Sequence, residues 1–309
     1  MPNIHKAALL NSVRQRVGDL HKLAGSNSLF IVGDDLARLY LRYSKVHPDG
    51  RTFFGLRDVD LRGLAGHNSY ICFFVDDGSA PLFVPYADFE ELFHQAEPAN
   101  DGQYKAQLIS AHGTRELYLP KMGRFNLDGF AGLETLINSV DSNRVRKLPE
   151  LSHSQVQTLL AGIGKAKGFD IFIPRPDVEN LDWSLTPKFG LRGEIPNGFS
   201  GISFILSEID VLWVAAGGNT IEGLFEVEHS TSIYSGLLRF NDVLLTDPSA
   251  TRFYIVSDEK RRDRFSRQAY RPTFRQSGLS ERASFLEYAN VFDWHQRLLQ
   301  GTSHEKNTK

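Results

Sequence analysis

Three carboxylates lie in two apolar segments that a glycine-rich turn connects. The stretch IDVLWVAAGGNTIEGLFEVEHSTS (residues 209–232) places Asp210 in the first segment and Glu226 and Glu228 in the second. Both segments have the length and the apolar content of buried β-strands. Burying an unpaired carboxylate costs several kcal/mol, so we expect a partner that holds these groups in the sheet.

Strand geometry predicts that these carboxylates converge. Side chains alternate between the faces of a strand, so Glu226 and Glu228 point the same way, and Asp210 shares its face with Glu208. If the strands pair through the turn, a hard cation, Mg²⁺ or Mn²⁺, offsets the repulsion between the carboxylates. Such a cation lowers the pKa of bound water and stabilises charge on a phosphodiester under attack. The pattern therefore predicts metal-assisted hydrolysis of a phosphodiester. Asp210 and Glu226 are the predicted metal ligands, and Glu228 is the predicted third catalytic residue. The alternative, for each carboxylate taken alone, is a position on a solvated face of the sheet.

This region resembles the core of the PD-(D/E)XK nuclease superfamily, which has the restriction-endonuclease-like fold. The resemblance lies in the strand IDVLWV, a short hairpin, the strand FEVEHSTS and the helix that follows it. The resemblance covers residues 150–295. It implies that Asp210 is the strand aspartate, that Glu226 begins the (D/E)-x-K pair, and that Glu228 occupies the lysine position, where some restriction enzymes of the superfamily carry Glu. The acidic residue that the family often has on the preceding helix is matched by Gln155, with Gln157 close by, and a glutamine there can orient water but cannot be a charged ligand.

The elements that must position these residues form an α/β pattern in the C-terminal half of the chain. We predict helices over 152–168, 232–245 and 259–270, and an irregular segment over 175–201. Strands are predicted over 169–174, 202–214, 223–230 and 252–258, and the last elements over 283–299. This pattern indicates a mixed sheet flanked by helices, in a nuclease-like domain over 150–300.

The N-terminal half has a different pattern of apolar residues, with one helix followed by short strands. Leu and Val at helical spacing predict one helix over 4–24, closed by Gly25. Short apolar runs with turns between them then indicate a mostly β (α+β) domain to about residue 140, with a hairpin at DDG (76–78) and a short helix in YADFEELFHQA. The charged, proline-containing stretch 140–152 fits a linker. We therefore expect a separate domain over 1–140. A mostly β domain ahead of a nuclease-like domain resembles the recognition-plus-cleavage arrangement of restriction systems, and this resemblance implies that the domain recognises DNA.

Several residues suit contacts with a nucleic-acid backbone. Ser230 and Thr231 directly precede the helix over 232–245, where they could receive a phosphate or simply cap the helix. The segment DEKRRDRFSRQAYRPTFR is the concentrated basic part of the chain, and its alternative is a solvated helix face. The predicted DNA contacts are Arg261, Arg264 and Arg267 in this segment and Arg57, Lys121 and Arg124 in the N-terminal half.

The whole-chain composition limits the function classes. The 309 residues carry a net charge of −2, so any basic surface is local, and a single cysteine excludes disulfides and cysteine-rich zinc sites. No apolar stretch reaches the length of a membrane span, so we expect a cytoplasmic protein without a membrane partner. The leading hypothesis is a Mg²⁺-dependent restriction endonuclease of type II character acting on double-stranded DNA, as a homodimer, with a methyltransferase or an ATPase as a further partner. The alternative is a non-catalytic DNA-binding or partner-binding protein on the same fold.

Overall fold

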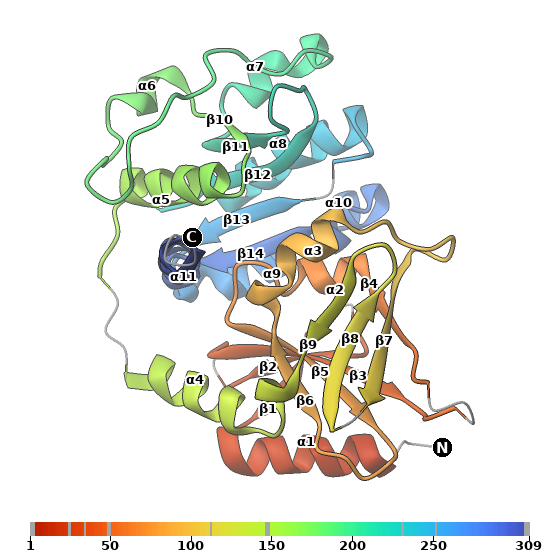
Figure 1. The fold of residues 1–309 in the computed structure, drawn as a ribbon. Helices are drawn as coiled ribbons and strands as arrows, with labels where there is room; N and C mark the ends of the chain where they lie inside the picture. The colour runs from red at the N-terminus through yellow and green to blue at the C-terminus, as the bar shows by residue number, and fades with distance from the viewer. Residues whose placement is uncertain are drawn as a thin grey trace. The chain divides into compact units, whose positions relative to one another are not determined.

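The computed structural model describes residues 4–23, 26–33, 35–47, 51–111, 113–145, 149–229, 232–250 and 252–305. The chain divides into two compact units, Met1–Lys147 and Leu148–Lys309, which carry separate sheets (Figure 1). In the described parts of the chain, no helix is long and apolar enough to cross a membrane.

The N-terminal unit contains two sheets and several helices. The first sheet has the strand order β1-β2-β3-β5-β6, in which β3 and β5 are parallel, and the second has the antiparallel order β4-β7-β8-β9. The strands are β1 (Leu20–Lys22), β2 (Leu29–Val32), β3 (Ala37–Ser44), β4 (Phe54–Arg57), β5 (Ser69–Val75), β6 (Leu82–Pro85), β7 (Gln103–Ala111), β8 (Thr114–Leu119) and β9 (Gly123–Asn126). The α-helices are α1 (Ile4–Val17), α2 (Asp58–Arg62), α3 (Glu90–Gln95) and α4 (Glu134–Val145).

Two apolar cores make this unit layered. One core lies between the two sheets, where Tyr40 and Phe73 of the first sheet meet Leu56 and Leu108 of the second. The other core lies on the opposite face of the first sheet, beneath α1 and α4. Alternate residues of β3 and β5 supply the two cores, as strand periodicity requires.

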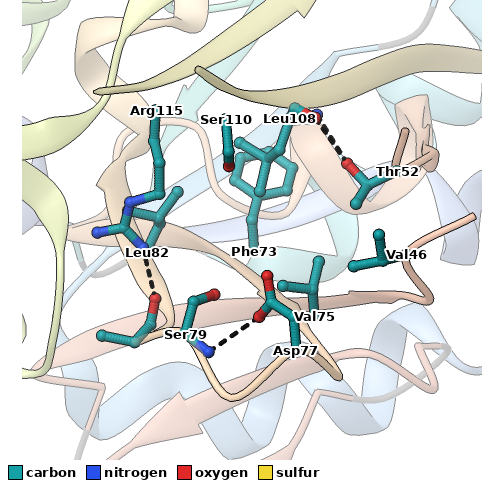
Figure 2. Close-up of a pocket in the computed structure, with 11 residues that line it drawn as sticks. Val46, Thr52, Phe73, Val75, Asp77, Ser79, Leu82, Leu108, Ser110 and Arg115 are labelled. Carbon is teal, nitrogen blue, oxygen red and sulfur yellow. Dashed lines mark hydrogen bonds between the residues drawn. The ribbon is translucent and has the colours of Figure 1, made fainter. Parts of the chain in front are cut away.

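A cavity of about 160 Å³ lies in the N-terminal unit, between residues of β5, β6, β7 and β8 and the segments beside them (Figure 2). The buried Thr52 hydroxyl donates to the Leu108 carbonyl at 3.0 Å and accepts from the Leu108 amide at 2.9 Å. Arg115 donates to the carbonyl of Ala80 at 2.8 Å. The walls of the cavity therefore combine apolar side chains with hydroxyl groups and with the charged side chains of Asp77 and Arg115.

The C-terminal unit is built on one mixed sheet with the order β10-β11-β12-β13-β14. β10 to β12 form an antiparallel meander, and β13 and β14 add parallel to β12. The strands are β10 (Asp170–Phe172), β11 (Val211–Val214), β12 (Ile221–Val227), β13 (Phe253–Ser257) and β14 (Ala283–Glu287). The α-helices are α5 (His153–Ala166), α6 (Arg175–Val178), α7 (Ser203–Leu206), α8 (Ile233–Thr246), α9 (Arg262–Ala269), α10 (Pro272–Ser277) and α11 (Tyr288–Glu305).

Helices cover both faces of this sheet. Leu212, Leu224 and Ile255 pack against α8, whereas Trp213 and Phe225 belong to the core shared with α5 and α11. Because side chains alternate, Asp210 and Glu226 have the strand parity of the α8 face. The predicted fold class is confirmed: a mixed α/β sheet flanked by helices follows a mostly β N-terminal part.

Three predicted elements differ from the structure. The helix predicted over 4–24 ends at Val17, because Leu20–Lys22 pairs with β2 as a strand, and Gly25 is outside the described residues. The stretch 140–152 is not simply a linker, since α4 runs to Val145 and its apolar residues Leu136 and Val140 are buried. The strand predicted over 202–214 is confined to Val211–Val214, because residues 200–206 form short helical turns.

Candidate active site

Asp210 lies immediately before β11, at the end of that strand next to the carboxyl end of β12. Its Oδ2 atom accepts a hydrogen bond of 2.6 Å from the backbone amide of Val227 in β12. The side chain is 16% exposed, so it is largely but not completely buried. A bond to the neighbouring strand therefore fixes the direction of the Asp210 carboxylate.

Glu226 has an arginine partner on α8. Arg239 donates from Nε and Nη2 to the two carboxylate oxygens of Glu226, at 2.6 and 2.7 Å. The two parallel bonds form the bidentate geometry that makes an arginine–carboxylate pair strong. Glu226 is buried, and the partner expected for a carboxylate in this sheet is Arg239.

Glu228 follows β12 and is buried on the same side. A Cβ atom added at Gly236 of α8 would lie 3.1 Å from both the Cγ of Glu226 and the Oε1 of Glu228. Glycine at this position therefore lets the helix approach the two glutamates closely. The structure brings Glu226 and Glu228 together against α8, whereas Glu208, also predicted to share this face, lies in a turn with a largely exposed side chain.

Burial and charge act on these groups as one cluster. Burial raises the pKa of Glu226 above its ordinary value, the charges of Asp210 and Glu228 act in the same direction, and the hydrogen bond and charge of Arg239 oppose them. The pKa of Arg239 is raised above its ordinary value, chiefly by the hydrogen bond to Glu226, and all three carboxylates contribute. Asp210, Glu226, Glu228 and Arg239 are therefore electrostatically coupled.

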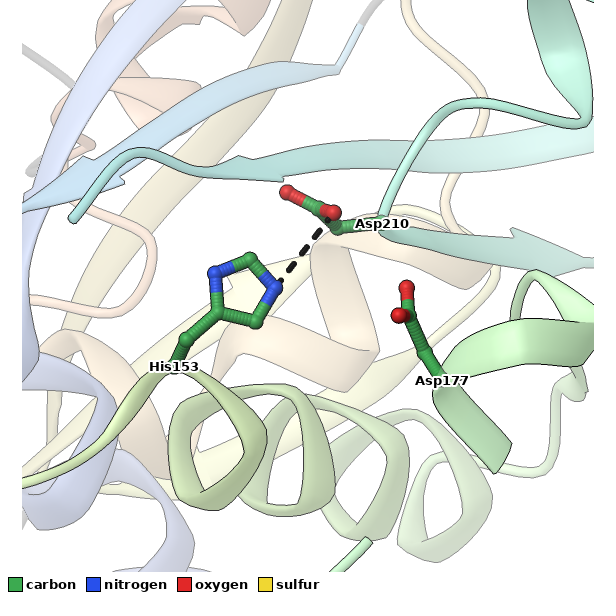
Figure 3. Close-up of side chains that lie close together, drawn as sticks. All are labelled: His153, Asp177 and Asp210. Carbon is green, nitrogen blue, oxygen red and sulfur yellow. Dashed lines mark ion pairs between the residues drawn. The ribbon is translucent and has the colours of Figure 1, made fainter. Parts of the chain in front are cut away.

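A second group of side chains includes Asp210. The side chains of His153, at the start of α5, and Asp177, in α6, point toward the space beside Asp210 (Figure 3). His153 Nε2 is 3.5 Å from Asp210 Oδ1, and one ligand atom from each of the three residues lies within 4.8 Å of the others. The hydrogen bond to Asp210 raises the pKa of His153, although burial opposes it. One imidazole and two carboxylates suit a divalent cation such as Mn²⁺, so this group could hold a metal ion.

The two glutamines of α5 have different places. Gln155 completes the capping box of the helix with Ser152, and its Nε2 donates to Asp182 at 3.1 Å, so its side chain is engaged away from Asp210. Gln157 is buried, and its Nε2 donates to Asp177 Oδ2 at 3.0 Å and to the Asp210 carbonyl at 3.4 Å. Gln157 is thus the residue of α5 that is bonded both to Asp177 and to the backbone of Asp210.

The predicted phosphate-binding residues of the C-terminal half are partly described. Ser230 and Thr231 lie outside the described residues. Arg261 donates to the backbone carbonyl of Glu228, which ties the basic segment to the end of the carboxylate strand. Arg264 and Arg267 are exposed on α9.

The three predicted contacts of the N-terminal unit are all paired with carboxylates. Arg57 forms a bidentate pair with the buried Asp60, at 2.7 and 2.9 Å. Lys121 lies 2.6 Å from Glu97, and Arg124 lies 3.5 Å from Glu116. The pairs of Lys121 and Arg124 are exposed and therefore weak, so these cations remain available to a phosphate, whereas Arg57 is held by a buried partner.

Sequence reasoning did not identify Arg239, His153 or Asp177. Arg239 follows Gly236 by one helical turn, so a glycine and an arginine share the face of an amphipathic helix that directly follows the carboxylate strand. This combination is a usable signal for a buried ion pair. His153 and Asp177 are separated from Asp210 by long stretches of chain, and no local pattern connects them.

Comparison with known proteins places this half of the chain in a family. A relative from Neisseria meningitidis serogroup C, named type II restriction enzyme NmeDI, is 31% identical over 132 residues. The aligned part is 40% of this chain and 37% of the relative, so the match spans little more than a third of that relative's length. Residues 136–305, more than half of the chain, match the model of the type II restriction enzyme NmeDI C-terminal domain, and the chain therefore belongs to that family.

Proposed function

We propose that this protein is a divalent-metal-dependent DNA endonuclease of restriction type, with its active site around Asp210. The observation that carries the proposal is the position of Asp210, whose Oδ2 is fixed by Val227 while His153 and Asp177 approach it. Glu226 and Glu228 belong to the same electrostatic cluster. Membership of a restriction-enzyme domain family supports DNA as the substrate.

The PD-(D/E)XK assignment is part of this proposal. It is supported by the adjacent central strands β11 and β12, with Asp210 immediately before the first and Glu226 in the second. It is supported further by α8, which connects β12 to the parallel strand β13. We assign the strand aspartate to Asp210, the first residue of the pair to Glu226, and the usual lysine position to Glu228.

The donor atoms of the site fit a hard or borderline divalent cation. Asp210 would hold it together with His153 and Asp177 on one side or with Glu226 on the other. When bound, Mg²⁺ or Mn²⁺ would activate water and stabilise the charge that develops on the phosphodiester. Gln157 holds Asp177 in position, and His153 Nε2 lies 3.5 Å from Asp210 Oδ1, where it could serve as the nitrogen ligand.

The remaining residues suit binding of the DNA backbone. Arg264 and Arg267 offer exposed positive charge on α9, in the same unit as the carboxylates. We propose that the N-terminal unit recognises the target, with Lys121 and Arg124 contacting phosphates. Two copies of a chain with one centre can cut both strands of a duplex in one binding event, so we also propose a homodimer. A restriction activity further calls for a methyltransferase that protects the host DNA.

One observation favours a second function, a DNA-binding protein that does not cleave. A guanidinium already balances the charge of Glu226, so the sheet can hold this carboxylate without a metal ion. In that case the carboxylate cluster would be structural.

Cleavage of plasmid and phage DNA separates the two functions. We expect the full chain to cut DNA at defined sequences in Mg²⁺ or Mn²⁺ and to leave it intact in EDTA. Binding of DNA without cutting under every divalent ion tested would reject the nuclease and favour the non-catalytic protein.

A further inference from the structure

We propose that Arg239 is the built-in counter-cation of the carboxylate cluster, and that it must release Glu226 before this carboxylate can bind a divalent cation. The inference rests on the proposed metal centre and adds a residue that regulates its occupancy. It also makes the ion-paired structure and the metal-loaded protein two distinct arrangements of one side chain.

The contacts of Glu226 leave little access for a metal ion. Both of its oxygens accept bonds from Arg239, and the side chain is 2% exposed. On the other side, Gly236 brings the α8 backbone so close that even a Cβ atom would meet Glu226 and Glu228 at 3.1 Å. Among the described residues, the guanidinium therefore fills the position beside both Glu226 oxygens that a cation would need.

Charge leads to the same conclusion. Arg239 interacts with Asp210 and Glu228 as well as with Glu226. A divalent ion held by Asp210 would thus be repelled by a neighbouring fixed positive charge, in a partly buried place where solvent screens poorly. Metal binding and the Arg239–Glu226 pair should compete.

A second carboxylate, Glu208, lies close enough to accept the Arg239 guanidinium. Its side chain is 24% exposed, and Nη1 is already 3.7 Å from Oε2 of Glu208, whose side chain is 66% exposed. Glu208 precedes β11 and lies outside the buried sheet. Rotation of the guanidinium toward Glu208 keeps its charge paired while it frees Glu226.

Calorimetric titration of the full chain with Mn²⁺ tests this competition without any cleavage assay. Arg239→Gln removes the competing charge and should bind Mn²⁺ about tenfold more tightly than wild type. Glu208→Gln removes the alternative partner and should bind about twofold to threefold more weakly. Arg275→Gln and Glu194→Gln remove the same charges from exposed positions and serve as matched controls with unchanged Mn²⁺ affinity.

Thermal melting gives a second readout. Arg239→Gln removes the cation that is hydrogen-bonded to Glu226, so the Tm of this variant in EDTA should be lower than the wild-type Tm. Adding Mn²⁺ should raise the Tm of the variant by more than it raises the Tm of wild type. Arg239→Lys keeps the charge but loses the bidentate geometry, so its Tm in EDTA and its rise in Tm on adding Mn²⁺ should lie between those of wild type and Arg239→Gln. If the glutamine variant fails to fold, the lysine variant provides the test.

The outcomes separate this inference from the proposed function. If wild type binds Mn²⁺ but neither Arg239 variant binds it more tightly, Arg239 is not a competitor and the inference is wrong, while the metal centre stands. If wild type and all variants bind no Mn²⁺, the metal centre and the inference both fail.

Discussion

Asp210 is a member of two groups of side chains, and the choice between them decides which residues are metal ligands. On one side it belongs with Glu226 and Glu228, whose charge Arg239 balances. On the other side His153 and Asp177 lie within metal-binding reach, with Gln157 holding Asp177. Among the described residues, Arg239 is hydrogen-bonded to Glu226 rather than to His153 or Asp177, so the second group should take the first cation.

Charge-neutral substitutions distinguish the two ligand sets. We expect Asp177→Asn to weaken Mn²⁺ binding about tenfold or more, because it removes a charged ligand from the group that lies away from the guanidinium. Glu226→Gln should have a smaller effect on the first binding event. Calorimetric titration measures the Mn²⁺ affinity of both variants. If Asp177→Asn bound Mn²⁺ as tightly as wild type, the primary metal ligands would be Asp210 and Glu226 instead.

The sequence allowed the carboxylates to be identified but not most of their partners. Period-two alternation predicts that Glu226 and Glu228 share a face, and both indeed lie against α8. Their proximity to Asp210 depends on the pairing of β11 with β12, which the glycine-rich turn signals. His153 and Asp177 reach the site through tertiary packing of α5 and α6, which leaves no periodic trace in the sequence.

At the scale of elements, α9 is an exposed basic helix that either binds DNA or only faces solvent. We expect the Arg264→Ala, Arg267→Ala double variant to bind DNA more weakly at all sequences, with the salt slope reduced by about 0.9 for each phosphate that is no longer neutralised. Fluorescence anisotropy over a range of salt concentrations measures the slope. An unchanged slope would mean that α9 is only a solvated surface.

Arg261 is not equivalent to its two neighbours. It donates to the backbone carbonyl of Glu228 and so supports the end of the carboxylate strand. The double variant therefore keeps Arg261, because replacing it could also disturb the carboxylate strand, and the cause of weaker DNA binding would then be ambiguous.

The packing of α11 on α5 contains a buried histidine that should make stability depend on pH. His295 is buried, neither ring nitrogen has a hydrogen-bond partner in the described structure, and Gly162 of α5 leaves it room. Burial lowers the pKa of His295 below its ordinary value of 6.5. The unfolded chain therefore takes up the proton first, and stability is lost as the pH falls below about 6.5.

Replacing this histidine tests that sign. His295→Gln does not titrate, so its Tm should fall less than that of wild type between about pH 7 and about pH 5. His21→Gln, at an exposed position of β1, is the control and should follow wild type. Parallel pH profiles of wild type and His295→Gln would show that burial of this histidine does not contribute to acid sensitivity.

Elements with one clear periodicity could be predicted, and elements in ambiguous apolar runs could not. The helix predicted over 232–245 matches α8, which has one continuous apolar face. ISFILSEIDVLWV suits a helix or a strand equally, and the structure divides it into the helical turn Ser203–Leu206 and the strand Val211–Val214. The end of α4 falls in the stretch predicted as a linker, because polar residues surround its buried pair Leu136 and Val140.

At the scale of the whole molecule, the division at Lys147 and Leu148 makes the roles of the two units separable. We expect a fragment of residues 1–147 to bind duplex DNA, and a fragment of residues 148–309 to lose sequence preference and most of its affinity. Gel shifts with both fragments, after circular dichroism has shown that each is folded, measure this. A folded fragment 1–147 that binds no DNA would contradict the recognition role.

The central claim is that Asp210 organises a metal-dependent nuclease centre, and cleavage of supercoiled plasmid by Asp210→Asn tests it most directly. The substitution removes the charge while nearly preserving the shape, so cleavage in Mg²⁺ or Mn²⁺ should fall at least about a hundredfold while DNA binding and Tm stay near wild type. Asp263→Asn, on the exposed face of α9, is the matched control and should cut like wild type. Undiminished cleavage by a folded Asp210→Asn protein would contradict the account.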